Sequence, residues 1–212
     1  MTILHESTPD TGVIPDPVFH ALRGGRPVLL VDDLGPHADC QLVFAARDAS
    51  TELLALTVRH TSGFVVVALP EGEADRLRLA PMTYGRGDAP AYGVAVDAED
   101  TGTGISATAR ARTIALLGEP GTSPDRFTRP GHVITYRAHD DGVLGRAAVW
   151  EAACDLVGLA GAGFAAAGAC LVSERDPLRA ARLPELAPWA TGLGVPHLRA
   201  SAVRAHRLAA HR

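Results

Sequence analysis

Apolar residues follow two different spacings along this chain, and the two spacings alternate. Compact apolar runs bounded by Gly, Pro or Asp predict buried strands, most clearly at residues 26–31 and 64–69. Ser50 and Ser106 each stand before a segment with helical spacing, which predicts two capped helices. Because strand and helix signals mix throughout, without a repeat or a linker, the pattern predicts an α/β or α+β fold in a single domain, residues 1–212.

The remaining elements follow from the same reasoning. Further strands are predicted at residues 42–46, 92–96, 132–137, 169–172 and 197–201. Helices are predicted for the segment that ends at 22–25 and for 51–58, 74–79, 106–117, 144–159 and 203–212, with helical spacing also at 183–190. Segments rich in Gly and Pro predict loops at 82–90 and 120–130.

Composition excludes several classes of function. Of the 212 residues 47% are hydrophobic, enough for a sizeable core, and the net charge of −4 implies no basic surface for a nucleic acid. No apolar run is long enough to cross a bilayer, and the polar residues 1–17 are unlike a signal peptide. We therefore expect a cytoplasmic protein that binds neither nucleic acid nor membrane. Because the sequence contains no lysine, a Schiff-base lysine and a P-loop lysine are excluded.

The three cysteines show no pattern of a disulfide framework or a zinc cluster. Their number is odd and their spacing is unpaired, so buried thiols are expected for Cys154 and Cys170. Cys40 lies in a predicted loop. A small loop thiol and a catalytic nucleophile both remain open for it.

Four segments carry a resemblance to a known family. They are residues 25–33 (Gly-Arg-Pro-Val-Leu-Leu-Val-Asp-Asp), 58–63 (Val-Arg-His-Thr-Ser-Gly), 103–114 with its Thr-Gly-Ile-Ser-Ala start, and 129–133 (Arg-Pro-Gly-His-Val). Together, from about residue 18 to 193, they resemble 3,4-dihydroxy-2-butanone 4-phosphate synthase of the riboflavin pathway. The GTP cyclohydrolase part of the bifunctional riboflavin enzymes is not seen in this sequence.

The resemblance implies a mixed α/β fold and a homodimer with active sites at the subunit interface. It also implies a small-molecule substrate. In the family, ribulose 5-phosphate and a divalent metal, magnesium or manganese, give a four-carbon phosphate and formate. A metal on the hydroxyketone oxygens stabilises an enediolate while carboxylates move protons.

Several residues match the family's functional positions. The resemblance implies that segment 129–133 holds the substrate phosphate through its arginine and backbone, and the metal through its histidine. The loop before helix 106–117 resembles the family's phosphate-side loop, and one glutamate matches an essential residue of the family. The residues concerned are Arg129, Gly131, Val133 and His132, then Thr103 and Gly104, and finally Glu151.

The acidic loop departs from the family. After the two aspartates the family reads Arg-Glu-Asn-Glu-Gly-Asp, whereas residues 36–41 here read Pro-His-Ala-Asp-Cys-Gln. The metal-binding glutamate is thus His37, and only Asp39 keeps an acid in this register. Before Glu151, the family's His-Thr is replaced by Val-Trp. Trp150 would add apolar bulk to the substrate site, and burial there would raise the pKa of Glu151.

These changes leave the metal open. Magnesium prefers oxygen ligands, whereas His37 together with His132 would favour zinc, iron, nickel or another transition metal. For His37 a solvent-exposed loop histidine is an equal alternative. A site without any metal also stays open.

Three functions compete. The favoured one is an enzyme with changed chemistry, a lyase, isomerase or cyclase of specialised metabolism that acts on another small molecule. Its acid/base residue would be Glu151, joined by His132, Asp39 and Cys40. The second is a non-catalytic binding or scaffold protein. The third, ranked last, is a working 3,4-dihydroxy-2-butanone 4-phosphate synthase with a rearranged site.

Overall fold

The computed structural model describes residues 12–82 and 91–210, and in these residues seven strands form one mixed sheet. The strand order is β4-β5-β3-β6-β2-β1-β7. Strands β1 and β7 are parallel, as are β3 and β5, and the other pairs are antiparallel. The strands are β1 (Val28–Val31), β2 (Cys40–Ala45), β3 (Val66–Pro70), β4 (Tyr92–Ala98), β5 (Phe127–Ala138), β6 (Ala166–Cys170) and β7 (His197–Arg199).

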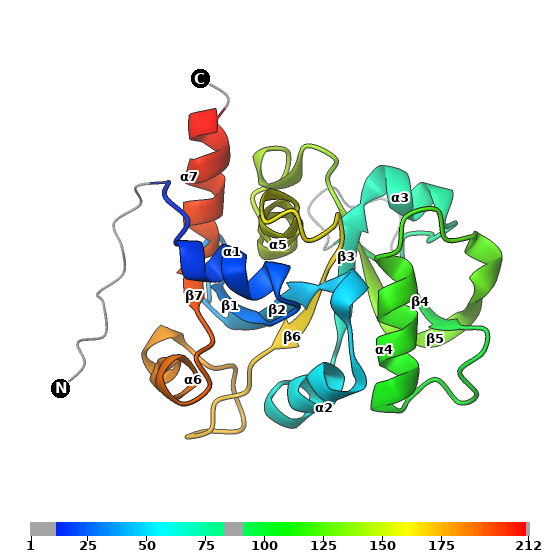
Figure 1. Cartoon of the computed structure of the whole chain (residues 1–212), viewed down its shortest axis with the longest axis horizontal. Coiled ribbons are helices and arrows are strands. Elements are labelled where there is room, and N and C mark those ends of the chain that lie inside the picture. Colours follow the sequence, from blue (N-terminus) through cyan, green and yellow to red (C-terminus); the bar gives the residue numbers. More distant parts are fainter. Residues whose placement is uncertain (1–11, 83–90, 211–212) are drawn as a thin grey trace.

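Helices cover both faces of this sheet (Figure 1). Helices α1, α5 and α7 pack on one face, and α2, α4 and α6 pack on the other. Short α3 follows β3 directly. The helices are α1 (Asp16–Arg23), α2 (Thr51–His60), α3 (Glu71–Arg76), α4 (Ala107–Leu117), α5 (Val149–Leu159), α6 (Ala187–Gly192) and α7 (Ala200–Ala210).

The central strands are buried on both faces, which explains their continuous apolar runs. Along β3, Val66 and Ala68 face the α5 side, while Val67 and Leu69 face the α4 side. All of β1 is buried for the same reason. The covered sheet confirms the predicted α/β class. The prediction of a single domain over residues 1–212 stays a prediction.

Local signals located most elements correctly. The Ser50 hydroxyl accepts a hydrogen bond from the Leu53 amide at 3.2 Å, and the Ser106 hydroxyl accepts one from the Ala109 amide at 3.1 Å. Both predicted helix caps are therefore confirmed. The described residues contain no helix long and apolar enough to cross a membrane. Residues 1–11 and 83–90 lie outside the described part; they include most of the predicted 82–90 loop and residues 1–11 of the segment compared with a signal peptide.

Several predicted bounds are wrong. Strand β5 begins at Phe127, inside the predicted loop 120–130, because pairing with β4 extends it. Helix α5 begins at Val149, not at 144, since Gly142–Leu144 forms a separate 3-10 turn. Helix α3 forms three residues earlier than predicted. Helix α7 begins at Ala200, within the predicted last strand.

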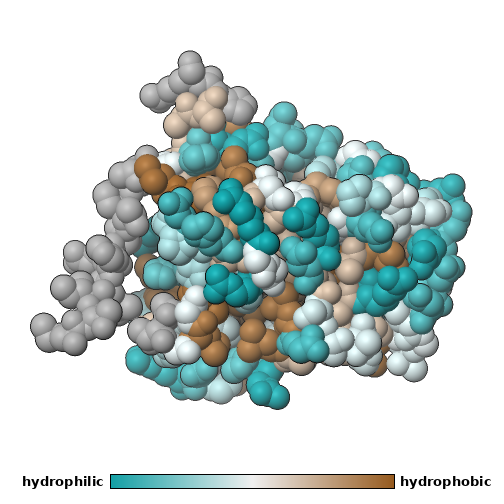
Figure 2. Space-filling model, viewed as in Figure 1, coloured by the Kyte–Doolittle hydropathy of each residue, from teal (hydrophilic) through white to brown (hydrophobic). Residues whose placement is uncertain are grey.

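The molecular surface is mixed in polarity. Figure 2 shows polar residues over most of one face, with apolar residues gathered between α6 and α2. There the ring of His60 packs edge-on against Trp189, with centroids 5.1 Å apart. His60 therefore has a packing role between α2 and α6.

Candidate functional site

The sheet topology brings the acidic loop 32–39 and segment 129–133 to the same end of the strands. The loop 32–39 joins the end of β1 to the start of β2, where Val31 pairs with Cys40. Cys170, at the end of β6, pairs with Gln41 in the next position. His132 lies in β5 just before Ile134, which pairs with Val66 at the start of β3. The acidic loop and segment 129–133 therefore lie at the same end of the strands.

His132 is held by Asp97 through two hydrogen bonds. The backbone amide of His132 donates to Asp97 Oδ1 at 2.9 Å, and its ring Nδ1 donates to Asp97 Oδ2 at 2.7 Å. The Asp97 side chain is nearly buried, whereas that of His132 is 42% exposed. A carboxylate on Nδ1 leaves Nε2 as the free acceptor nitrogen, able to bind a proton or a metal.

Two glycines make room for this pair. A Cβ on Gly104 would lie 2.0 Å from Asp97 Oδ2, and one on Gly131 would lie 2.0 Å from the carbonyl carbon of Val96. Gly104 also has a φ of +77°, which favours glycine. The loop before α4 and segment 129–133 thus converge on Asp97. Sequence reasoning missed Asp97, although an acid at the end of an apolar strand was a visible signal.

The predicted phosphate residues have different surroundings. The guanidinium of Arg129 donates to the carbonyl of Phe127 at 2.9 Å and to that of Leu77 at 2.8 Å. Thr103 is exposed. The Val133 side chain is fully buried in the core, so only its backbone could face a ligand. Arg129 therefore ties β5 to the end of α3, in addition to any role toward an anion.

Asp32 and Asp33, at the start of the acidic loop, have different hydrogen-bond partners. Asp33 accepts hydrogen bonds from the amide and the hydroxyl of Ser201, at 2.9 and 2.6 Å, and so anchors the start of α7. Asp32 accepts a bond from the Gly35 amide at 3.1 Å. Burial raises the pKa of Asp32, and the nearby charges of Asp33 and Asp39 raise it further. Asp39 is partly exposed, and His37 is exposed.

The structure argues against Cys40 as a nucleophile. Its side chain is fully buried on the face toward α6, and burial raises the pKa of its thiol to about 12. A thiol that stays protonated in the core is unreactive. Burial likewise raises the pKa of Cys154 to about 12 and that of Cys170 to about 11. Cys40 is thus a buried thiol at the start of β2 and not a loop thiol; Cys154 is buried as predicted, whereas Cys170 is only partly buried.

The donor set does not fit a magnesium ion. Among residues 12–82 and 91–210, no three His, Cys, Asp or Glu side chains come together as a possible metal site. His37 and His132 offer nitrogen, whereas magnesium demands near-octahedral oxygen ligands. The predicted pair of His37 and His132 is thus not part of a larger ligand cluster in the described residues.

Glu151 lies at the start of α5, away from the strand ends that carry His132 and the acidic loop, and it is fully buried. Its Oε1 accepts from the guanidinium of Arg146, and its Oε2 accepts from the hydroxyl of Tyr136 at 3.2 Å. Burial raises the pKa of Glu151, while Arg146 opposes this by attraction and hydrogen bonding. A buried carboxylate next to one cation can act as an acid or a base.

Trp150 does not line an open substrate site. It is 6% exposed and packs in the core between α5 and the sheet, with its ring centroid 6.4 Å from that of Tyr136. The predicted substrate contact of Trp150 is therefore replaced by a packing role, since the side chain points inward. Sequence reasoning missed Arg146 and Tyr136. The only signal was the position of Arg146, five residues before Glu151.

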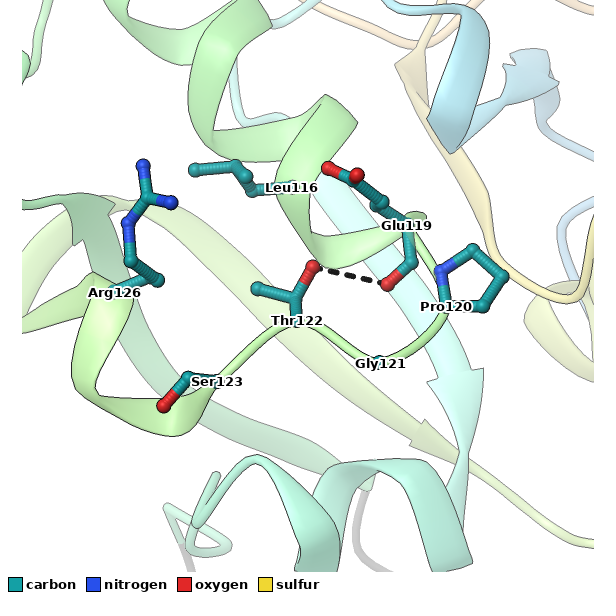
Figure 3. Close-up of a pocket in the computed structure, with 7 residues that line it drawn as sticks. All are labelled: Leu116, Glu119, Pro120, Gly121, Thr122, Ser123 and Arg126. Carbon is teal, nitrogen blue, oxygen red and sulfur yellow. Dashed lines mark hydrogen bonds between the residues drawn. The ribbon is translucent and has the colours of Figure 1, made fainter.

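A separate shallow hollow lies at the C-terminal end of α4 (Figure 3). Its volume is about 250 Å³, and the Thr122 hydroxyl donates to the Glu119 carbonyl at 3.0 Å within it. None of the site residues predicted from the sequence lines it. The lining residues are Leu116, Glu119, Pro120, Gly121, Thr122, Ser123 and Arg126.

Comparison with known proteins agrees with this geometry. Residues 16–206 match the family model of 3,4-dihydroxy-2-butanone 4-phosphate synthase. The riboflavin biosynthesis protein RibBA of Salinispora tropica is 46% identical over 168 residues, which cover 78% of this chain and 42% of that protein. RibBA of Mycobacterium marinum is 43% identical over 177 residues, covering 82% and 42%. The chain thus spans about two fifths of the length of these curated relatives.

Solved structures give the same result. A 3,4-dihydroxy-2-butanone 4-phosphate synthase in complex with two magnesium ions has a TM-score of 0.82 and 34% identity, covering 90% of this chain and 94% of that one. A cation-free form has a TM-score of 0.82 and 33% identity, covering 93% and 98%. The two-domain RibBX from A. baumannii has a TM-score of 0.82 and 29% identity, covering 89% and 56%.

Proposed function

Because this chain belongs to the 3,4-dihydroxy-2-butanone 4-phosphate synthase family, we propose that it is a lyase acting on a phosphorylated hydroxyketone. Ribulose 5-phosphate is the proposed substrate, and the four-carbon phosphate and formate are the products. The observation that carries the proposal is the match of residues 16–206 to the family model, and Glu151, held between Arg146 and Tyr136, is the residue to which we assign the proton transfer. This ranks first the function that the sequence alone ranked last.

The chemistry needs proton transfers and no oxidant. The five carbons of the substrate divide into a four-carbon phosphate and formate with all atoms conserved. The step assigned to Glu151 is removal of a proton from the carbon beside the carbonyl, which yields an enediolate. His132, oriented by Asp97, lies away from Glu151 and is assigned no part in this step. No step here depends on a metal, because the described donors do not fit magnesium.

A second candidate function is supported by the loop 36–41. A histidine, a proline and a glutamine stand where the family has a glutamate, an arginine and an aspartate, and His37 is exposed. These changes support an enzyme with another small-molecule substrate. They also support a non-catalytic binding protein, for which Glu151 would be dispensable.

Formate release from ribulose 5-phosphate tests the first proposal. We expect turnover by the wild type, with magnesium, manganese or zinc supplied in parallel, and a loss of about 10²–10⁴-fold in Glu151→Gln. The variant should keep its unfolding temperature within a few degrees. Folded wild type without formate release would contradict the proposed substrate. Equal binding of a ligand by wild type and Glu151→Gln would favour the binding protein.

A further inference from the structure

The two oxygens of Glu151 have different side-chain partners. Arg146 Nε donates to Oε1, Arg146 Nη2 forms an ion pair with the same oxygen, and Tyr136 donates to Oε2. Arg146 also donates to the carbonyl of Arg137, and its guanidinium lies 5.4 Å from the centre of the Tyr136 ring. Arg146 and Tyr136 therefore contact each other as well as the glutamate.

We propose that Arg146 and Tyr136 are positioning residues that keep Glu151 an ionised carboxylate, with Arg146 supplying the charge and Tyr136 fixing the orientation. The inference rests on the proposed function in one respect, the use of Glu151 as a base. A carboxylic acid that carries its own proton cannot accept one from a substrate. The state of this carboxyl is therefore a property that the two neighbours must control.

Burial alone would neutralise Glu151. Its side chain has no exposed surface, and removing a carboxylate from water strongly favours the protonated form. Arg146 is the cation in direct contact, and its side chain keeps 33% exposure, so the arginine remains solvated on its outer side. That outer side faces Glu71, whose Oε1 is 4.0 Å from Arg146 Nη1. Arg146 thus connects a buried carboxylate with the surface.

The other groups near Glu151 do not supply a positive charge. Cys154, on α5, is a protonated thiol whose pKa is raised by burial and, to a smaller extent, by the charge of Glu151. Burial and the charge of Glu151 raise the pKa of Tyr136, so Tyr136 stays a neutral donor. Beyond Tyr136 lies the ring of Tyr92, with centroids 5.4 Å apart. The task of keeping Glu151 ionised therefore falls on Arg146.

Infrared difference spectroscopy on the full chain tests the inference. Protein labelled with ¹³C in its glutamate carboxyl groups is measured at pH 7, and the spectrum of Glu151→Gln is subtracted to isolate one side chain. We expect a carboxylate band in the wild type. Arg146→Met should convert it to the band of a protonated carboxyl, and Arg146→Lys should restore the carboxylate. Tyr136→Phe should keep the carboxylate but shift its band.

Two matched variants serve as controls. Arg23→Met removes an arginine that donates to the Ala160 carbonyl at the other end of α5, and Tyr92→Phe removes a hydroxyl from the neighbouring ring. Neither should change the Glu151 band. An unchanged carboxylate band in folded Arg146→Met would overturn the inference, as would a protonated carboxyl in the wild type. The band does not depend on turnover, so absence of formate release would sink the proposed function and leave this result standing.

Discussion

Asp97 shows how a single residue can organise a site whose motif lies elsewhere in the sequence. It accepts two hydrogen bonds from His132, and Gly104 and Gly131 approach it so closely that a side chain would overlap. The Asp97 side chain and the positive φ both require a glycine at 104, whereas the backbone of Val96 and Asp97 requires one at 131.

Gly104→Ala should destabilise the protein more than Gly121→Ala. Both glycines have a φ of +77°, so each substitution has the same backbone cost of about 1–2 kcal/mol. A Cβ at 121 meets nothing within 4 Å, whereas one at 104 overlaps the Asp97 carboxylate. We expect a further loss of about 1–3 kcal/mol for Gly104→Ala, measured by urea unfolding. Equal losses in the free energy of unfolding would mean that the Asp97 side chain moves aside without a measurable energetic cost.

Metal content separates the two histidine hypotheses. If His132 and His37 share a transition metal, protein loaded with zinc should lose it in His132→Ala and in His37→Ala. If His37 is only an exposed loop residue, His37→Ala should keep the wild-type content. Elemental analysis after gel filtration measures both, with His20→Ala as a control on an outer helix. Wild type that retains no metal would exclude the shared site.

At the scale of elements, one carboxylate stabilises the long loop between β6 and α6. Glu185 accepts from the guanidinium of Arg179 at 2.7 and 3.2 Å and from the Ser173 hydroxyl at 2.5 Å. These bonds, with that of the Arg182 amide, join the two ends of a long loop. Strand pairing contributes little here beyond isolated bridges, so side chains determine the loop's conformation.

The stability contributed by Glu185 should depend on pH. Hydrogen bonds from Arg179 and Ser173 lower its pKa from the ordinary 4.5 to about 2. A carboxyl with a lowered folded pKa stabilises the fold above pH 4.5, and this contribution is lost as the pH falls toward 2. Glu185→Gln should thus lower the unfolding temperature at pH 7, with the difference from wild type shrinking below pH 4.5. A constant difference would contradict the assignment.

At the scale of the whole molecule, the family resemblance implies a homodimer with sites at its interface, and we keep this as a proposal. Phe64, Met82 and Ile105 are large apolar residues with about half of their surface exposed. Phe64 stands just before β3, at the end of the strands that carries His132. An exposed apolar side chain such as Phe64 at that end suits an interface next to the site.

Light scattering after gel filtration should give twice the mass of one chain. Phe64→Glu should shift the protein toward the single chain, because a charge in an apolar interface is costly. The matched control is Leu178→Glu, since Leu178 is 96% exposed in the loop before α6 and should not affect assembly. A wild type with the mass of one chain would contradict the dimer. Dissociation by Leu178→Glu alone would place the interface elsewhere.

Much of the fold was predictable because its signals are local. Ser50 and Ser106 cap their helices through contacts three residues away, and the double-sided burial of 28–31 shows as an unbroken apolar run. The start of β5 at Phe127 was not predictable. It depends on pairing with β4, which lies about thirty residues earlier, and pairing partners leave no local trace.

The candidate site divides in the same way. The sequence by itself determined the α/β class, the family resemblance and the positions of His132 and Glu151, because residue type and order are enough for each. Only the tertiary structure decided their neighbours. Asp97 contacts His132, whereas Arg146 and Tyr136 contact Glu151. The side chains of Cys40 and Trp150 lie in the core. Burial and contact between distant segments create these environments, and a linear pattern records neither.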